Sequence, residues 1–269
     1  MSDRVTVDLS EGIADVRLNR PEKLNALDDA MFTALTEAGK SLAADRSLRA
    51  VVLSAEGRAF CAGLDFAGFQ GLAGADGQQT GGGLLARSDD SVANRAQRPA
   101  WVWQELPVPV IAAVHGVAFG GGLQIALGAD IRLVTPDARL SVREIHWGLI
   151  PDMTLTQTLR HLVRLDVAKE LTFTGREVSG AEAVALGLAT QVSDDPREAA
   201  FEMAREIATR SPDAVRAAKS LLNETPHLGL AEGLRLEAKT QAGLIGKPNQ
   251  VEAIRANLEK REPKFRDPQ

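Results

Sequence analysis

Short apolar strands alternate with helices through the first half of this chain, and that order limits its fold more than any other feature. AVVLSA at 50–55 and VPVIAAVHG at 108–116 each indicate a short buried strand. A helix is predicted over 120–128, and DIRLVT at 130–135 indicates another strand. Chains that alternate strands and helices in this way form α/β domains.

The N-terminal segment predicts a β-hairpin followed by a helix. VTVDL at 5–9 and IADVRLN at 13–19 alternate apolar and polar residues, and the three residues between them suit a turn. Asp28 or Asp29 can then cap a helix that runs to about Ala44.

Helices dominate from about residue 154 onward. Ser179 and Glu182 form a capping box for a helix that ends at Gly187, and SPDAVRAAKSLLNE at 211–224 has proline in a first helical turn. Residues 230–261 indicate two more helices, broken at GKPN. We therefore expect a mixed core domain over 1–200 and a helical region over 201–269.

The stretch 66–100 between the two halves is rich in glycine and polar residues. Such a segment is expected to be a mobile surface insertion, or else a lid over a cleft.

Composition excludes several classes of protein. The chain has 269 residues, 44% of them hydrophobic, which is enough for one large buried core. Its net charge is −5 and it has no basic run, so a nucleic-acid partner is not expected. No apolar run reaches 18 residues, which argues against a membrane span. The single cysteine, Cys61, cannot form an intrachain disulfide, so we expect a small buried residue and a cytoplasmic protein.

Three consecutive glycines in HGVAFGGGLQIALGAD at 115–130 need a chemical explanation. A dinucleotide fingerprint fails because Ile125 stands where its third glycine belongs, and a P-loop fails because Leu123 and Gln124 follow Gly122. The chain has no H-E-x-x-H or C-x-x-C motif, so no metal site is predicted, and no G-x-S-x-G elbow. Phosphate, metal and serine-hydrolase chemistry are therefore not indicated.

The glycines suit backbone donors that approach a ligand closely. A helix start leaves its first N–H groups without partners, and glycine has no side chain to keep a ligand away. GRAFCAGLD at 57–65 is a second loop of this kind, with Ala62 and Gly63 exposing backbone. The two loops could converge on one oxygen as an oxyanion hole, or they could be plain tight turns.

Five segments together resemble the enoyl-CoA hydratase/isomerase (crotonase) superfamily. They are NRPEKLNALD at 19–28, GRAFCAGLD at 57–65, VIAAVHGVAFGGGLQIALGADIRL at 110–133, SVREIHWGLIPD at 141–152 and LEKREPKF at 258–265. The resemblance extends from about Val5 to Phe265. It implies a spiral core of ββα units, a C-terminal all-helical region that makes homotrimers or hexamers, and an acyl-CoA substrate. Coenzyme A would enter as part of that substrate, with no separate cofactor.

The resemblance also assigns binding roles by position. The oxyanion N–H groups would belong to Leu64 and Gly121. The opening loop would touch the CoA moiety, and Ala62 and Asp65 would lie beside its adenine. The full binding set that it implies is Lys23, Asn25, Ala26, Ala62, Gly63, Asp65, Gly120 and Trp147. Acyl-pocket residues are expected among Leu64, Phe66, Trp101, Trp103, Trp147 and Leu149.

The catalytic segment departs from the hydratase pattern. Hydratases of this family hold water between two glutamates, of which one matches Glu144 and the other falls at Gln124. Because Gln124 follows Gly121 by three residues, its side chain is expected to point into the site. An amide cannot exchange a proton at neutral pH, so Gln124 could only hold a water or the substrate. Glu144 is the expected general acid/base, with its pKa raised beside Ile145 and Trp147.

Asp152 leaves the reaction open. Relatives that shift double bonds in dienoyl-CoA carry an acidic pair at the spacing of Glu144 and Asp152. Alternatively, Asp152 is the N-cap of a helix that begins with MTLTQTLRHL. The candidates are a hydratase with Gln124 as water holder, an isomerase using Glu144 and Asp152, and a non-catalytic acyl-CoA-binding oligomer.

Overall fold

The protein is described by a computed structural model that covers residues 3–65, 83, 85–87 and 90–268. Its main sheet has six strands in the order β1-β2-β3-β4-β6-β9. The N-terminal hairpin β1 (Val5–Ser10) and β2 (Ile13–Leu18) is antiparallel, as the sequence predicts. The next strands add in parallel: β3 (Ala50–Ala55), β4 (Val110–Val114), β6 (Ile131–Val134) and β9 (Gln191–Val192).

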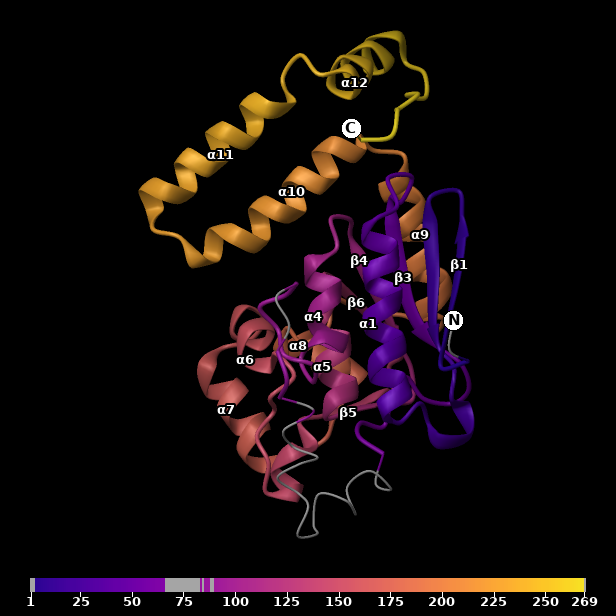
Figure 1. The fold of residues 1–269 in the computed structure, drawn as a ribbon, viewed down its shortest axis with the longest axis vertical. Helices are drawn as coiled ribbons and strands as arrows, with labels where there is room; N and C mark the ends of the chain where they lie inside the picture. Colours follow the sequence, from indigo (N-terminus) through magenta and orange to yellow (C-terminus); the bar gives the residue numbers. More distant parts are fainter. Residues whose placement is uncertain (1–2, 66–82, 84, 88–89, 269) are drawn as a thin grey trace.

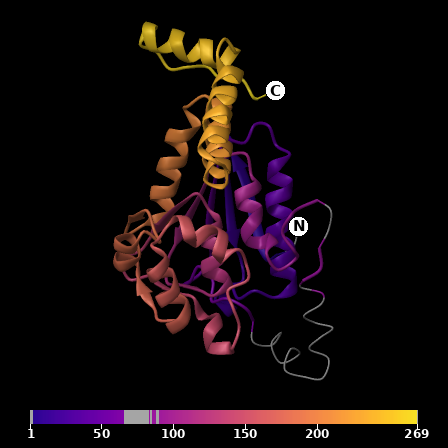
Figure 2. The ribbon, with the colours of Figure 1, turned by 90° about the vertical axis from the view of Figure 1, so that its left-hand side faces the viewer.

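Helices cover both faces of this sheet because its central strands are apolar on both sides. Every residue of β3 and β4 is buried. Alternate residues of a strand point to opposite faces. On one face, Val51 and Leu53 belong to the core that packs against α1 (Asp29–Ala43), α4 (Arg98–Glu105) and α5 (Gly121–Gly128). On the other face, Ala50 and Val52 pack with α9 (Pro196–Ala208). Figure 2 shows indigo α1 and orange α9 on opposite sides of the sheet.

A second sheet of three short strands lies beside the start of α5. It contains β5 (Val117–Phe119), β7 (Arg139–Ser141) and β8 (Val178–Ser179). The 3₁₀ turn η1 (Pro21–Lys23) lies between β2 and α1, and η2 (Arg143–Trp147) follows β7. After η2 come α6 (Leu155–Thr158), η3 (Leu159–His161), α7 (Leu165–Thr174) and, past β8, α8 (Gly180–Leu186).

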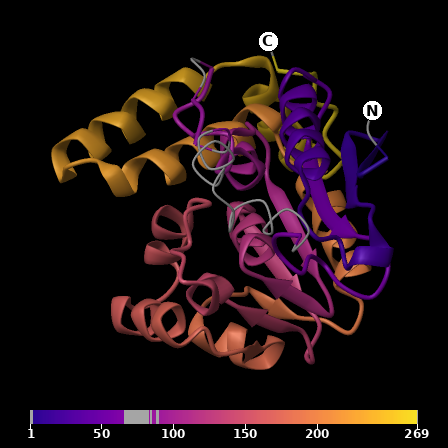
Figure 3. The ribbon, with the colours of Figure 1, turned by 60° about the horizontal axis from the view of Figure 1, so that its bottom comes forward.

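Three C-terminal helices project from the core (Figures 1 and 3). They are α10 (Pro212–Glu224), α11 (Leu230–Leu244) and α12 (Pro248–Glu259), with the 3₁₀ turn η4 (Thr225–His227) after α10. Lys219 ties α10 to the core: it is buried, lies 2.8 Å from Asp130, and donates to the carbonyls of Trp103 and Val108 at 2.9 Å. None of the helices in the described part is both long and apolar enough to cross a membrane.

The elements predicted from the sequence are largely present where expected. Asp28 is the N-cap of α1 and accepts a hydrogen bond from the Met31 amide at 2.8 Å. Ser179 caps α8, which ends at Gly187 with a left-handed backbone. Cys61 is completely buried, and desolvation raises the pKa of its thiol to about 12.

Two segment boundaries differ from the expectation. Residues 66–82, 84, 88 and 89, which include most of the predicted insertion or lid, lie outside the described residues. The end of that stretch is part of the core instead, since Ala93, Ala96 and Ala100 are buried. Similarly, α9 spans the expected boundary at residue 200, and Ala204, which lies on the helical side of that boundary, packs on the main sheet together with Ala200.

Candidate active site

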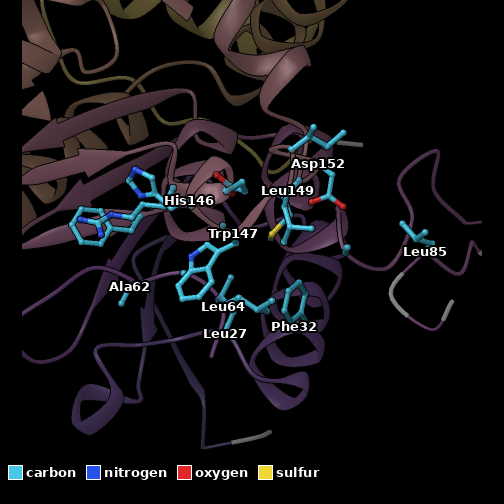
Figure 4. Close-up of a pocket in the computed structure, with 18 residues that line it drawn as sticks. Leu27, Phe32, Ala62, Leu64, Leu85, His146, Trp147, Leu149 and Asp152 are labelled. Atoms are coloured by element: carbon cyan, nitrogen blue, oxygen red, sulfur yellow. The ribbon is translucent and has the colours of Figure 1, made fainter. Parts of the chain in front are cut away.

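One cavity of about 500 Å³ brings together the segments singled out in the sequence. Its walls come from the loop before α1, the loop after β3, the start of α5, and the chain from η2 to α6. Figure 4 shows Ala62 and His146 toward one end, with Asp152, Phe32 and Leu85 toward the other. The lining is mostly apolar and consists of Leu27, Phe32, Ala62, Gly63, Leu64, Leu85, Ala96, Phe119, Gly120, Gly121, Arg143, Glu144, His146, Trp147, Leu149, Ile150, Asp152 and Met153.

Two backbone amides on the cavity wall make no hydrogen bond to any described residue. Leu27 pairs with Leu64 as an isolated parallel bridge, which uses the Gly63 carbonyl and the Asp65 amide. The Leu64 N–H is left over by this pairing. Gly121 is the first residue of α5, and its N–H likewise lacks an acceptor among the described residues. Both groups are therefore available to an oxygen of a ligand.

Glycine permits the close approach of these two segments. Gly63 has a φ of +86°, and a Cβ built on it would lie 2.7 Å from the Phe119 carbonyl oxygen and 3.8 Å from the Gly121 nitrogen. Any side chain there would push the loop after β3 away from the start of α5. The two loops predicted to converge do meet at one cavity.

Glu144 stands on η2 with its carboxyl over Gly120. A Cβ on Gly120 would lie 3.2 Å from Glu144 Oε1. Gln124 Nε2 donates to the same oxygen at 2.6 Å, whereas Oε2 is buried and has no hydrogen-bond partner among the described residues. Burial raises the pKa of this half-buried carboxyl above its ordinary 4.5. Backbone and Gln124 hydrogen bonds lower that pKa, and the nearby Asp152 raises it.

Asp152 lies on the rim of the same cavity. The residue is exposed overall, but partial loss of water around its carboxyl raises the pKa above the ordinary 3.8. The N-cap alternative for Asp152 is wrong, because α6 begins at Leu155 and its N-cap is Thr154. The structure therefore places two carboxyls with raised pKa values on one apolar cavity.

Gln124 does not occupy the position expected for a water holder. Its side chain is 1% exposed and lies behind Glu144, outside the cavity lining. The expected side chain that points into the site is not found, because Gln124 reaches Glu144 and does not itself line the cavity.

The opening loop around Lys23, Asn25 and Ala26 contributes none of these three residues to the cavity lining, but its hydrogen bonds hold neighbouring segments of the site in place. Asn25 is fully buried, and its side chain accepts from the Arg20 amide and donates to the carbonyls of Glu56 and Ala59. Asn25 therefore holds the opening loop in place, and its expected contact with the CoA moiety stays a prediction. Its neighbour Leu24 accepts from the Ala62 amide at 2.9 Å, which holds this loop beside the cavity.

The remaining predicted residues divide into two groups. Ala62, Gly63, Gly120 and Trp147 line the cavity. Lys23 is exposed on η1 and Ala26 is partly buried, both outside the lining, and Asp65 pairs with Arg20 at 2.7 Å.

Only some of the residues expected to form the acyl pocket line the cavity. Leu64, Trp147 and Leu149 line the cavity. Trp103 is completely buried in the core, so that expectation is wrong, whereas Trp101 is partly buried on α4 and does not line the cavity. Phe66 lies outside the described residues.

Sequence reasoning missed Arg143 and Phe32 as lining residues. The Arg143 guanidinium lies 4.1 Å from the centre of the Phe119 ring and pairs with Glu177. Its place directly before Glu144 was a usable signal. Phe32 had no such signal, because its contact with the cavity depends on how α1 is seated.

Comparisons with known proteins point to one family. Residues 8–268 match the family model described as enoyl-CoA hydratase/isomerase. The chain is 32% identical over 259 residues to the mitochondrial Delta(3,5)-Delta(2,4)-dienoyl-CoA isomerase of Rattus norvegicus, which covers 94% of this chain and 78% of that protein. It is also 32% identical over 264 residues to the mitochondrial methylglutaconyl-CoA hydratase of Mus musculus. That alignment covers 96% of this chain and 80% of the mouse protein.

Solved structures show the same fold. The crystal structure of an enoyl-CoA hydratase from Bacillus anthracis has a TM-score of 0.88 at 30% identity and covers 97% of this chain and 98% of that chain. The predicted α/β core with C-terminal helices is thereby confirmed. On the evidence of a full-length family match and of closely similar structures, this chain belongs to the enoyl-CoA hydratase/isomerase (crotonase) family.

Proposed function

We propose that the enzyme relocates a double bond in the acyl chain of a 3-enoyl- or 3,5-dienoyl-CoA, with Glu144 and Asp152 as the proton carriers. The observation that carries this proposal is the pair of carboxyls on one apolar cavity, both with raised pKa values. The free amides of Leu64 and Gly121 on the same cavity would bind the thioester oxygen.

The chemistry needs these groups because the α-proton of a thioester is only weakly acidic. When Glu144 takes a proton from C2, the electrons of the C–H bond move onto the thioester oxygen as an enolate. Two fixed N–H donors stabilise that charge more in the transition state than in the ground state. A proton returned farther along the chain completes the shift: removal from C2 and addition at C6 converts a 3,5-diene into a 2,4-diene.

Hydration is the second candidate and is less favoured by the contacts. Water addition through two acid/base groups would need a proton carrier at residue 124 as well as at Glu144. Gln124 cannot exchange a proton at neutral pH, and its amide is already bonded to Glu144.

A substrate panel in deuterated water tests the proposal. We expect 3-enoyl- or 3,5-dienoyl-CoA to give a conjugated product with deuterium at a carbon of the acyl chain. A 3-hydroxyacyl-CoA as the main product of 2-enoyl-CoA would instead establish hydration. Binding of acyl-CoA without turnover of any substrate would establish a non-catalytic protein.

The electrostatic coupling between Glu144 and Asp152 should be visible in the pH dependence of proton exchange at C2. Glu144 must be ionised to act as a base, so kcat/KM falls as pH decreases through its pKa. Because that pKa is raised, we expect the acid limb above pH 4.5. Since Asp152 raises the Glu144 pKa, Asp152→Asn should move the limb to lower pH. The measurement is deuterium exchange at C2 of an acyl-CoA across pH, and an upward movement of the limb would contradict this coupling.

We also propose that the C-terminal helices assemble homotrimers, or hexamers made of two trimers. Large apolar side chains on α10 to α12 are exposed in the single chain, and such surfaces mark protein contacts. They include Leu222, Leu230, Leu234, Val251, Ile254 and Leu258. Sedimentation equilibrium should give three or six times the mass of one chain, and Leu234→Glu should lower it. A monomeric wild-type protein would reject this assembly.

A further inference from the structure

Gln124 is held between two partners that fix the direction of its amide. The Leu155 backbone N–H reaches Gln124 Oε1 at 3.3 Å, and Gln124 Nε2 reaches Glu144 Oε1 at 2.6 Å. A backbone N–H can only donate, so the amide oxygen must face Leu155. The amide nitrogen therefore faces Glu144, independently of how the two ends of the side chain are assigned.

This contact leaves the two oxygens of Glu144 in different situations. Oε1 accepts from Gln124, whereas Oε2 has no partner among the described residues. We propose that Gln124 is a positioning residue that fixes the Glu144 carboxyl through Oε1 and keeps it ionised, so that this carboxylate can take the substrate proton. The inference deepens the proposed isomerase function and rests on it, because it assigns Glu144 as the base that acts first and Asp152 as the group that acts second.

The physical reason is the strength of the hydrogen bond in the two charge states. An N–H donor binds a carboxylate about twice as strongly as a neutral acceptor, so it favours the charged form of Glu144. A glutamate at residue 124 would do the opposite. Two carboxyl oxygens at 2.6 Å cannot both be ionised, and they would share a proton.

The other charged groups at the cavity do not replace this contact. Asp152 is the second acidic residue that lines the described cavity, and its charge opposes ionisation of Glu144. Arg143 and His146 on η2 also line it, but Arg143 is paired with Glu177. The lining residues from the end of β5 to the start of α5 are Phe119, Gly120 and Gly121, which do not titrate.

The test is a direct titration of Glu144 in the full-length enzyme without substrate. Carbon-13 label at the glutamate carboxyls allows the titration to be followed by NMR, and the Glu144 signal is the one missing in Glu144→Gln. Gln124→Met, which keeps the length but removes the donor, should raise the Glu144 pKa by about 1 unit or more. Gln124→Glu is nearly isosteric and should raise it further.

Gln157→Glu is the matched control for added charge. Gln157 is exposed on α6 and bonds to Thr156, so the same substitution there should move the Glu144 pKa less than Gln124→Glu does. In kinetics, the acid limb of kcat for Gln124→Met should move upward with the titration, so that kcat falls at the pH values on that limb with little change in KM.

The outcomes separate this inference from the proposed reaction. A Glu144 pKa that is unchanged in both Gln124 variants overturns the positioning role, whatever the enzyme's products are. A raised pKa in a protein that hydrates 2-enoyl-CoA supports the effect of Gln124 on Glu144 and rejects the isomerase assignment.

Discussion

Replacing Glu144 with glutamine should lower the rate of C2 proton removal by about 10³–10⁴-fold, toward the upper end of what a general base contributes. Glutamine has the same shape but cannot accept a proton at neutral pH. The cavity and its two free amides remain, so acyl-CoA should bind with nearly unchanged affinity. The measurement pairs deuterium exchange at C2 with calorimetric binding of a saturated acyl-CoA.

A distant glutamate provides the control for this substitution. Glu170 lies on α7, pairs with Arg176, and does not line the cavity. Glu170→Gln should leave exchange within about twofold of wild type, because substitutions away from the site have small effects. Retention of more than about a tenth of the wild-type exchange by Glu144→Gln would remove Glu144 from the role of base.

Local signals in the sequence were sufficient for most of the fold. Asp28 at the start of α1 and Ser179 at the start of α8 act through neighbours three residues away, so their roles are visible in the sequence itself. The same is true of β3 and β4, whose unbroken apolar runs require burial on both faces. The resemblance to a family then supplied the arrangement of these elements.

The sequence predicts several of the residues that line the cavity, but not the hydrogen bonds that they make. The loop with Gly63 and the start of α5 were both expected at one place, and both line the cavity. The hydrogen bond from Gln124 to Glu144 was not foreseen, because it depends on how η2 folds back over α5. The expectation that Trp103 lines the acyl pocket was wrong for a related reason. The sequence around an aromatic residue does not show whether its side chain faces the core or a ligand.

Gly122→Ala should reduce kcat by about 10²–10³-fold, the usual effect of losing one oxyanion-hole donor. A Cβ on Gly122 would lie 2.4 Å from the Cys61 carbonyl oxygen and 2.7 Å from Cys61 Cβ. Neither position can be vacated by rotating a flexible side chain, so the start of α5 must move away from the loop after β3. The Leu64 and Gly121 amides would then no longer bind one oxygen together.

The expected loss falls on kcat more than on KM, because the amides stabilise charge that is full only in the enolate. Gly243→Ala on α11 is the control: it places the same methyl group in a helix, with no atom within 4 Å of it, and should leave turnover unchanged. Thermal unfolding of both variants separates a displaced loop from a protein that has lost its fold. A folded Gly122→Ala enzyme with wild-type kcat would show that the thioester oxygen does not depend on the meeting of these two segments.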